Sequence, residues 1–228
     1  PALDSVVETL VNRPEGYPLS LQNLAPGDLE TLRSRYWSSV SRYLQRRPGT
    51  RLVDKNPFNF CRVQLIMALF PQAKLIFVTR HPCDVVLSCF MQNFGFSDAT
   101  RGFWTIGDSA AIYDKAISIW LEQKARLKPD CLDLWYEDVV ADLPLQLQRI
   151  AAFLGLEVDP AMLEFHRHAQ SRRINTPSYS QVVQPLYGSS VARWHRYRPW
   201  FAEVEPRLLE LARRMGYPRS QAMAEAKA

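Results

Sequence analysis

A basic and a hydroxyl side chain follow one predicted strand at the spacing of a phosphate site. Arg80 ends the apolar run 73–79, and Pro82 then begins a predicted helix. A guanidinium at a strand end can hold a phosphate through two parallel hydrogen bonds. Ser88 lies eight residues further, about two helical turns on and on the same side, where its hydroxyl can reach the same phosphate. An ion pair between Arg80 and Asp84 that caps the helix is an equally good interpretation of these residues.

A second segment combines a lysine with a predicted strand end. Lys55 follows a predicted strand at 51–54 and precedes a helix that Pro57 begins. The helix N-terminus adds partial positive charge, so a lysine here can neutralise a leaving phosphate oxygen. The ordinary alternative is a surface lysine whose aliphatic stem lies along apolar neighbours.

A third segment, residues 178–194, is predicted to be an extended loop that runs into a helix. Basic and aromatic residues alternate through its helical end: Arg193, Trp194, Arg196, Tyr197, Arg198 and Trp200. A cationic helix face over a buried aromatic seam has this pattern, and so does a groove for single-stranded nucleic acid. One short cluster in a chain of net charge +5 argues against nucleic acid.

The order of the predicted elements favours an α/β fold of three layers, α/β/α, with a parallel sheet. Strands are predicted at 51–54, 73–79 and 132–136, and the run 73–79 is typical of a strand buried on both faces. Helices are predicted at 28–45, 57–70, 82–93, 109–127, 143–154, 160–168, 189–197 and 204–214. We expect one domain over 1–228, with 1–50 mostly helical and 51–228 forming the α/β core with its C-terminal loop and helices. In such sheets, ligands bind at the carboxyl ends of the strands.

The composition excludes some classes of protein. The chain has 228 residues, of which 47% are hydrophobic, enough for a substantial core. Its basic excess, 28 Lys and Arg against 23 Asp and Glu, suits an anionic small molecule or an acidic substrate. The apolar runs are too short to span a bilayer, so we expect no membrane partner. The cysteines lie in apolar stretches, as buried thiols of a reducing compartment do, so we expect a cytoplasmic location. The cysteines lack metal-ligand spacing, so we expect free thiols and no metal: Cys61, Cys83, Cys89 and Cys131.

Together these segments resemble the sulfotransferase superfamily, in particular a bacterial branch often fused to tetratricopeptide repeats and related to protein-tyrosine sulfotransferases. The resemblance runs from about residue 51 to residue 217. Residues 75–82 with Ser88 resemble the motif that binds the 3′-phosphate of the donor. Residues 53–57 resemble the tyrosine-sulfotransferase segment that supplies the catalytic lysine, here Lys55.

Two further segments of the resemblance assign nucleotide contacts. Residues 134–138 resemble the strand whose tyrosine, here Tyr136, contacts the adenine. Ser178 and Arg193 fall at the spacing of the serine and the basic residue that reach the nucleotide from the C-terminal loop. The resemblance implies a fold like that of P-loop nucleoside triphosphate hydrolases and 3′-phosphoadenosine 5′-phosphosulfate as donor, without a metal. The acceptor is then a hydroxyl of a small molecule or peptide, with a protein tyrosine as one candidate, and a homodimer stays open.

The family also has a first strand with a phosphosulfate-binding loop of the type Pro-Arg-Ser-Gly-Thr-Thr, followed by a glutamate base. Residues 1–50 contain no such loop, so we expect that strand, its loop and the general base to be missing from this sequence. Two alternatives remain at this point. A kinase-like phosphotransferase of related fold would need a Gly-Lys-Ser/Thr loop and metal-binding carboxylates. A noncatalytic interaction module would need neither.

Overall fold

The computed structural model describes the chain except residues 1, 46, 48, 93–100, 171–183 and 218–228. The chain forms two compact units. The first unit comprises residues 1–73 and 123–130, and the second comprises residues 74–122 and 131–228. The single domain expected from the sequence stays a prediction.

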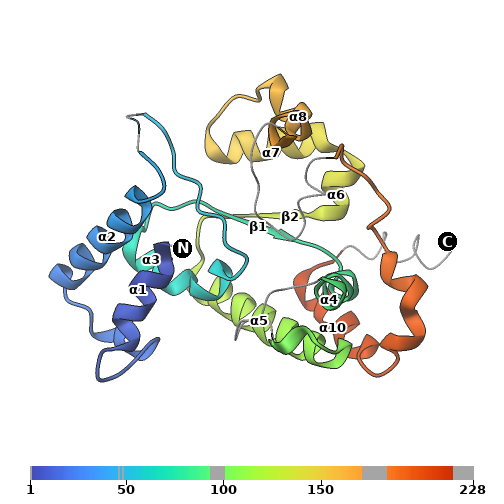
Figure 1. Cartoon of the computed structure of the whole chain (residues 1–228), viewed down its shortest axis with the longest axis horizontal. Helices are drawn as coiled ribbons and strands as arrows, with labels where there is room; N and C mark the ends of the chain where they lie inside the picture. The colour runs from blue at the N-terminus through green and yellow to red at the C-terminus, as the bar shows by residue number, and fades with distance from the viewer. Residues whose placement is uncertain (1, 46, 48, 93–100, 171–183, 218–228) are drawn as a thin grey trace. The chain divides into compact units, whose positions relative to one another are not determined.

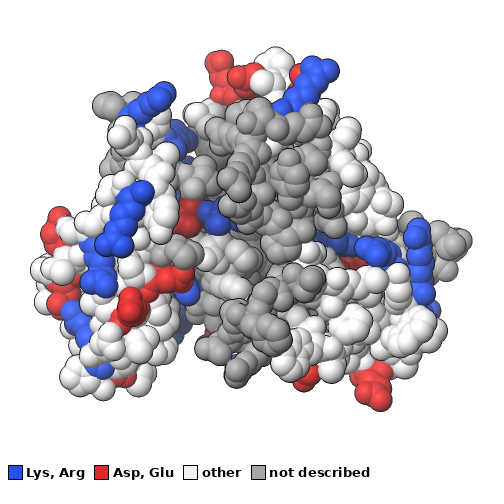
Figure 2. Space-filling model, viewed as in Figure 1, with Lys and Arg blue, Asp and Glu red and all other residues white. Residues whose placement is uncertain are grey.

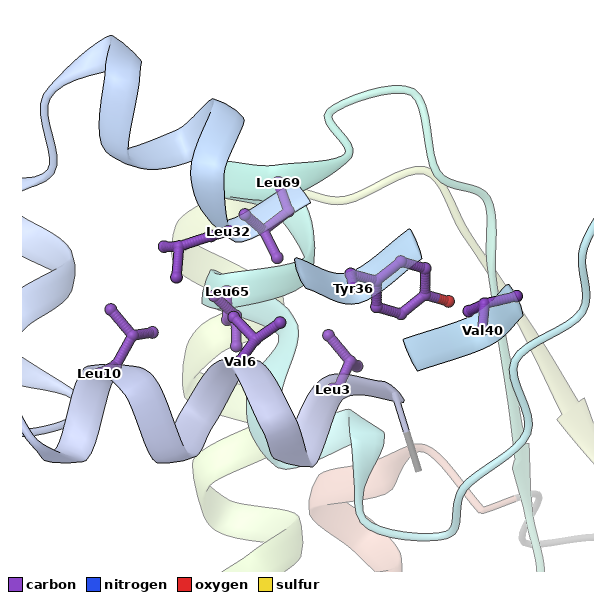
Figure 3. Close-up of a cluster of buried hydrophobic side chains, with 8 residues drawn as sticks. All are labelled: Leu3, Val6, Leu10, Leu32, Tyr36, Val40, Leu65 and Leu69. Carbon is purple, nitrogen blue, oxygen red and sulfur yellow. The ribbon is translucent and has the colours of Figure 1, made fainter. Parts of the chain in front are cut away.

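The first unit is helical and has its own hydrophobic core. Its elements are α1 (Ala2–Val11), η1 (Leu19–Asn23), α2 (Pro26–Ser41), η2 (Asn59–Arg62) and α3 (Val63–Leu69). Three of these helices contribute the buried side chains in Figure 3: Leu3, Val6 and Leu10 from α1, Leu32, Tyr36 and Val40 from α2, and Leu65 and Leu69 from α3. The helix predicted from residue 28 is therefore confirmed, and the four-residue spacing of Leu32, Tyr36 and Val40 makes α2 amphipathic.

The segment after α2 differs from the prediction. The helix ends at Ser41 instead of about residue 45, which leaves the Leu44 side chain 50% exposed. The predicted strand at 51–54 is wrong, because these residues form no strand and Val53 is 83% exposed. A strand requires a neighbouring strand for its backbone hydrogen bonds, and none pairs with this segment within the described residues.

The second unit contains a pair of parallel strands. β1 (Leu75–Thr79) pairs with β2 (Cys131–Trp135) in a register that runs from Leu75 opposite Cys131 to Thr79 opposite Trp135. The accompanying helices are α4 (Pro82–Met91), η3 (Arg101–Phe103), α5 (Ile106–Leu127), α6 (Tyr136–Ala141), α7 (Leu143–Leu154), η4 (Pro160–Glu164), α8 (Phe165–Gln170), η5 (Arg193–Phe201) and α10 (Glu205–Met215). In Figure 1, α6 and α7 lie on one side of the strand pair and α4 and α10 on the other. The α/β fold with a parallel sheet is thereby confirmed.

The expectation that both faces of β1 are buried is wrong. Phe77 stacks on Trp120 of α5, with ring centroids 4.6 Å apart, so one face is covered. On the other face Ile76 is 38% and Val78 is 63% exposed. The helices α6 and α7 contact β2 more extensively than β1, so this face of β1 is only partly covered. A continuous apolar run therefore does not by itself fix how much of a strand is covered.

Local sequence signals begin and end the helices next to the strands. Pro82 occupies the first turn of α4, and the His81 side chain accepts a hydrogen bond from the backbone amide of Cys83. Asp142 caps α7 by accepting from the amide of Leu145 at 3.0 Å. Gly155 ends α7 in the left-handed conformation, with φ +62°, as the sequence predicted.

Charged side chains are mixed over the first unit. Ion pairs join Arg13 to Asp28 at 2.6 Å and Arg33 to Glu30 at 3.5 Å. Figure 2 shows basic and acidic side chains interspersed over these helices, so no broad surface of one sign forms on this face of the unit. Isolated surface pairs of this kind contribute at most about 1 kcal/mol each to stability.

Candidate functional site

Three of the predicted site residues line one pocket in the second unit. The pocket is lined by Arg80, Asp84, Leu87, Ser88, Ser190 and Arg193. Arg80 follows the last residue of β1, Ser88 lies on α4, and Arg193 begins η5, which packs against α4. The cavity at its centre has a volume of about 30 Å³.

Arg80 is held by internal partners. One of its terminal nitrogens donates to the carbonyl of Ser190 and lies 3.2 Å from Oδ1 of Asp84. Its guanidinium carbon lies 5.2 Å from the ring centroid of Tyr136. Its Nε is buried and makes no hydrogen bond within the described structure. The ion pair with Asp84, left open by the sequence, is thus present, and Arg80 retains an unused donor.

Asp84 is the most buried charged residue at the pocket. Its side chain is 0% exposed, and its Oδ1 accepts the backbone amide of Trp194 at 2.9 Å. Its Oδ2 is buried and has no hydrogen-bond partner among the described residues. Burial raises the pKa of this carboxyl group, and the charge of Arg80 opposes that rise.

Tyr136 joins Arg80 to the segment that precedes η5. Its hydroxyl donates to the carbonyl of Tyr187 at 3.1 Å, while its ring lies beneath the Arg80 guanidinium. The pKa of Tyr136 is raised, chiefly because the phenol is partly buried. These contacts place Tyr136 beside the pocket, and its role at the adenine stays a prediction.

A buried polar cluster supports the end of β1. The backbone amide of His81 donates to Oε1 of Glu137 at 2.8 Å, and Glu137 is 4% exposed. The His81 ring lies parallel to Trp194, with an interplanar angle of 2° and centroids 5.5 Å apart. Burial lowers the pKa of His81 to about 4, so the imidazole is neutral at pH 7. Burial also raises the pKa of Glu137.

The remaining predicted site residues are Lys55 and Ser178. Lys55 is exposed in the first unit and does not line the pocket. Its neighbour Asp54 accepts hydrogen bonds from the Tyr36 hydroxyl at 3.0 Å and from Asn59 at 3.3 Å, which ties this segment to α2. Ser178 lies outside the described residues. Asp84 and Glu137 had no functional role in the sequence interpretation, although both stand inside the segments that predicted the site.

No three His, Cys, Asp or Glu side chains come together within the described residues in a way that would hold a metal ion. The cysteines are free thiols, and burial raises the pKa of Cys89 to about 11. No helix in the described ranges combines the length and the apolar character needed to cross a bilayer.

Comparison with known proteins identifies the family. The model of the sulfotransferase family matches residues 14–160, more than half of the chain. The chain therefore belongs to the sulfotransferase family, and the resemblance seen in the sequence is confirmed. The association with tetratricopeptide repeats stays a prediction.

Individual relatives agree with this family. An uncharacterized protein of Aquifex aeolicus is 28% identical over 200 residues, which are 84% of this chain and 25% of that protein. The omega-hydroxy-beta-dihydromenaquinone-9 sulfotransferase of Mycobacterium tuberculosis is 28% identical over 161 residues, 64% of this chain and 39% of that enzyme. Protein-tyrosine sulfotransferase A of Caenorhabditis elegans is 27% identical over 152 residues, 63% of this chain and 38% of that enzyme. The chain thus spans well under half of each of these relatives.

A solved structure supports the fold. The sulfotransferase domain from the curacin biosynthetic pathway superposes with a TM-score of 0.57 over 93% of this chain and 78% of that domain, at 20% identity. At this identity the similarity establishes the fold alone.

Proposed function

We propose that the protein transfers a sulfuryl group from 3′-phosphoadenosine 5′-phosphosulfate to an acceptor hydroxyl, and that the pocket at Arg80 holds the 3′-phosphate of this donor. The observation that carries the proposal is the convergence of Arg80, Ser88 and Arg193 on one pocket, although Arg193 is 105 positions after Ser88. Two guanidinium groups and a hydroxyl form a donor set that suits a phosphate dianion.

The buried atoms of the pocket are consistent with this ligand. The Nε of Arg80 is a buried donor without an acceptor in the described structure, and a phosphate oxygen would provide one. Asp84 is the single carboxylate among the lining residues, and its ion pair with Arg80 offsets its charge. On binding, Arg80 would exchange the Ser190 carbonyl for a phosphate oxygen.

Lys55 is the residue that we assign to the chemical step. A lysine ammonium placed at the bridging oxygen of the donor stabilises the negative charge that develops there as the bond to sulfur breaks. Ser178 and Arg193 close over the nucleotide phosphates, and Tyr136 contacts the adenine. The acceptor is a small molecule or a peptide, and the nematode relative supports a tyrosine hydroxyl as one class to test.

Nucleotide binding tests the donor. The protein is titrated with 3′-phosphoadenosine 5′-phosphate and with adenosine 5′-phosphate, and both the dissociation constant and the thermal shift are measured. Because a ligand stabilises the folded state according to its affinity, the nucleotide with the 3′-phosphate should give the larger shift. Equal affinities for the two nucleotides would contradict the assignment of the 3′-phosphate to this pocket.

A further inference from the structure

One oxygen atom of Asp84 joins two parts of the pocket that are far apart in the sequence. Oδ1 accepts the backbone amide of Trp194 at 2.9 Å and lies 3.2 Å from the terminal nitrogen of Arg80. Trp194 is 110 positions after Asp84. Asp84 itself belongs to the first turn of α4, the helix that carries Ser88. The atom therefore lies between the three elements that supply Arg80, Ser88 and Arg193.

The backbone turn next to Trp194 contains a residue in an unfavourable conformation. Ala192, which precedes Arg193, has φ +55° and ψ +20°, in the left-handed region. This region is unfavourable for a residue with a Cβ and persists where surrounding contacts enforce it. The Trp194 amide bond to Asp84 is such a contact, and the ring of Trp194, which is 3% exposed, packs on His81. The direction of Arg193 thus depends on Asp84.

We infer that Asp84 is a positioning residue of the nucleotide site, which orients Arg80 and the turn 190–194 through the location of its Oδ1 and does not itself bind the ligand. This inference rests on the proposed function, because it assigns a role at the 3′-phosphate pocket. An ionised carboxylate cannot donate to a phosphate, and the side chain of Asp84, although it lines the pocket, is fully buried. Its negative charge repels an anion and is offset by the ion pair with Arg80, so a favourable effect on a bound anion passes through the groups that it holds.

Asp84 could act through the position of its Oδ1 or through its negative charge, and these two hypotheses predict opposite results for two substitutions. Asp84→Asn keeps an acceptor oxygen at the place of Oδ1 and removes the negative charge. Its amide nitrogen would lie where Oδ2 already makes no hydrogen bond in the described structure. Asp84→Glu keeps the charge and displaces the oxygen by one methylene. If location is decisive, Asn is tolerated and Glu is not, whereas the reverse holds if the charge is decisive.

The experiment measures the 3′-phosphate ratio, defined as the dissociation constant of adenosine 5′-phosphate divided by that of 3′-phosphoadenosine 5′-phosphate. Both are determined by calorimetric titration of the purified protein at fixed pH and salt. A variant that is only less stable loses affinity for both nucleotides alike, so its ratio does not change. Asp114→Ala is the matched control, because Asp114 pairs with Arg207 at 2.7 Å in the same unit, between α5 and α10.

We expect Asp84→Ala and Asp84→Glu to lower the ratio about tenfold or more, the factor that corresponds to losing one hydrogen bond to a charged group. Asp84→Asn should stay within about threefold of the wild-type ratio, and Asp114→Ala should equal it. A wild-type ratio retained by Asp84→Glu, or lost in Asp84→Asn, would overturn the positioning role while leaving the proposed function intact. A ratio near one in the wild-type protein would instead overturn the proposed function and this inference with it. If Asp84→Ala does not fold, the comparison of Asn with Glu still decides the question.

Discussion

The guanidinium of Arg80 lies over the ring of Tyr136, 5.2 Å from its centroid, while the hydroxyl of the same tyrosine donates to the carbonyl of Tyr187. A cation over an aromatic face gains about 0.5–2 kcal/mol, depending on how far it is desolvated. Tyr136 therefore connects the end of β2 to Arg80 and to the segment before η5. Such a residue can act on the phosphate through Arg80, on the adenine directly, or on both.

Substitution of Tyr136 separates these roles. We expect Tyr136→Ala to lower the 3′-phosphate ratio by about threefold to tenfold, because Arg80 loses the ring beneath it. Tyr136→Phe keeps the ring and should leave the ratio unchanged. Calorimetric titration with both nucleotides provides the measurement. A contact with the adenine alone would weaken both nucleotides equally and leave the ratio of Tyr136→Ala at the wild-type value.

Arg80 should provide the largest part of the 3′-phosphate affinity. Arg80→Ala removes a charge-assisted hydrogen bond, so we expect affinity for 3′-phosphoadenosine 5′-phosphate to fall by about tenfold to a hundredfold, corresponding to 1.5–3 kcal/mol. Affinity for adenosine 5′-phosphate should change little. Arg207→Ala is the control, because Arg207 is a half-exposed arginine that pairs with Asp114 outside the pocket. If Arg80→Ala bound each nucleotide as tightly as Arg207→Ala does, the assignment of Arg80 to the 3′-phosphate would be wrong.

Lys55 should affect turnover more than binding. In a transfer assay with radiolabelled donor, on a form of the protein that also carries the phosphosulfate-binding loop and the general base, Lys55→Ala is expected to lower kcat by roughly a hundredfold or more, because the leaving oxygen loses a stabilising charge. The dissociation constant of 3′-phosphoadenosine 5′-phosphate should change much less. Lys55→Arg, which keeps a positive charge on a side chain of different shape, should retain part of the activity. An unchanged kcat with weaker nucleotide binding would show that Lys55 only anchors a phosphate.

His81 makes stability depend on pH. Its pKa is lowered by burial from 6.5 to about 4, so the unfolded chain binds a proton between these values and the folded protein does not. The contribution of the neutral imidazole is complete above pH 6.5 and is lost as the pH falls toward 4. We therefore expect the free energy of unfolding to fall by about 2 kcal/mol between pH 7 and pH 5. His81→Asn keeps an acceptor that can cap α4 and should lack this loss, as urea unfolding at both pH values would reveal. If the wild-type protein and His81→Asn lost the same free energy of unfolding between these pH values, His81 would not be the source of the pH dependence.

The core of the first unit allows a prediction that is independent of function. Leu65 is 0% exposed and belongs to the cluster shared by α1, α2 and α3. Leu65→Ala should lower the free energy of unfolding by about 2–5 kcal/mol through lost burial and the cavity left behind. Leu44→Ala is the matched control, because its side chain is 50% exposed and its loss should cost well under half as much. Equal destabilisation by the two substitutions would mean that Leu44 is buried in solution.

Elements with strong local signals were predictable from the sequence, and those that depend on neighbours were not. The helix at 143–154 was predicted with its observed bounds, because Gly155 marks its end, and in the structure Asp142 caps its start. The strand predicted at 51–54 failed because no amino-acid pattern specifies the partner that a strand needs. The short helix α6 was missed, since its six residues directly follow β2 without a separating turn.

The candidate site shows the same division. Arg80 and Ser88 were predicted because both lie within one strand-to-helix connection, and Arg193 because a family resemblance supplied its spacing. The link from Asp84 to Trp194 was not predicted, since a hydrogen bond across 110 positions depends on the tertiary fold. From the sequence, the partner of Arg80 could be either a phosphate or Asp84. The structure shows the ion pair with Asp84, and the Nε of Arg80 is still available for a phosphate oxygen.

The two contacts that join Arg80 to Ser190 and Asp84 to Trp194 each close a chain segment of 110 positions. Closing such a long segment costs more chain entropy than forming a helix or pairing neighbouring elements, so these contacts should form late in folding. The pocket would then be absent from partly folded states, and capture of a nucleotide would report completion of folding. In stopped-flow refolding, nucleotide binding should lag behind the recovery of helical circular dichroism, and simultaneous recovery of both signals would contradict this order. A nascent molecule would consequently be unable to sequester donor nucleotide until residues 190–194 had joined residues 80–84.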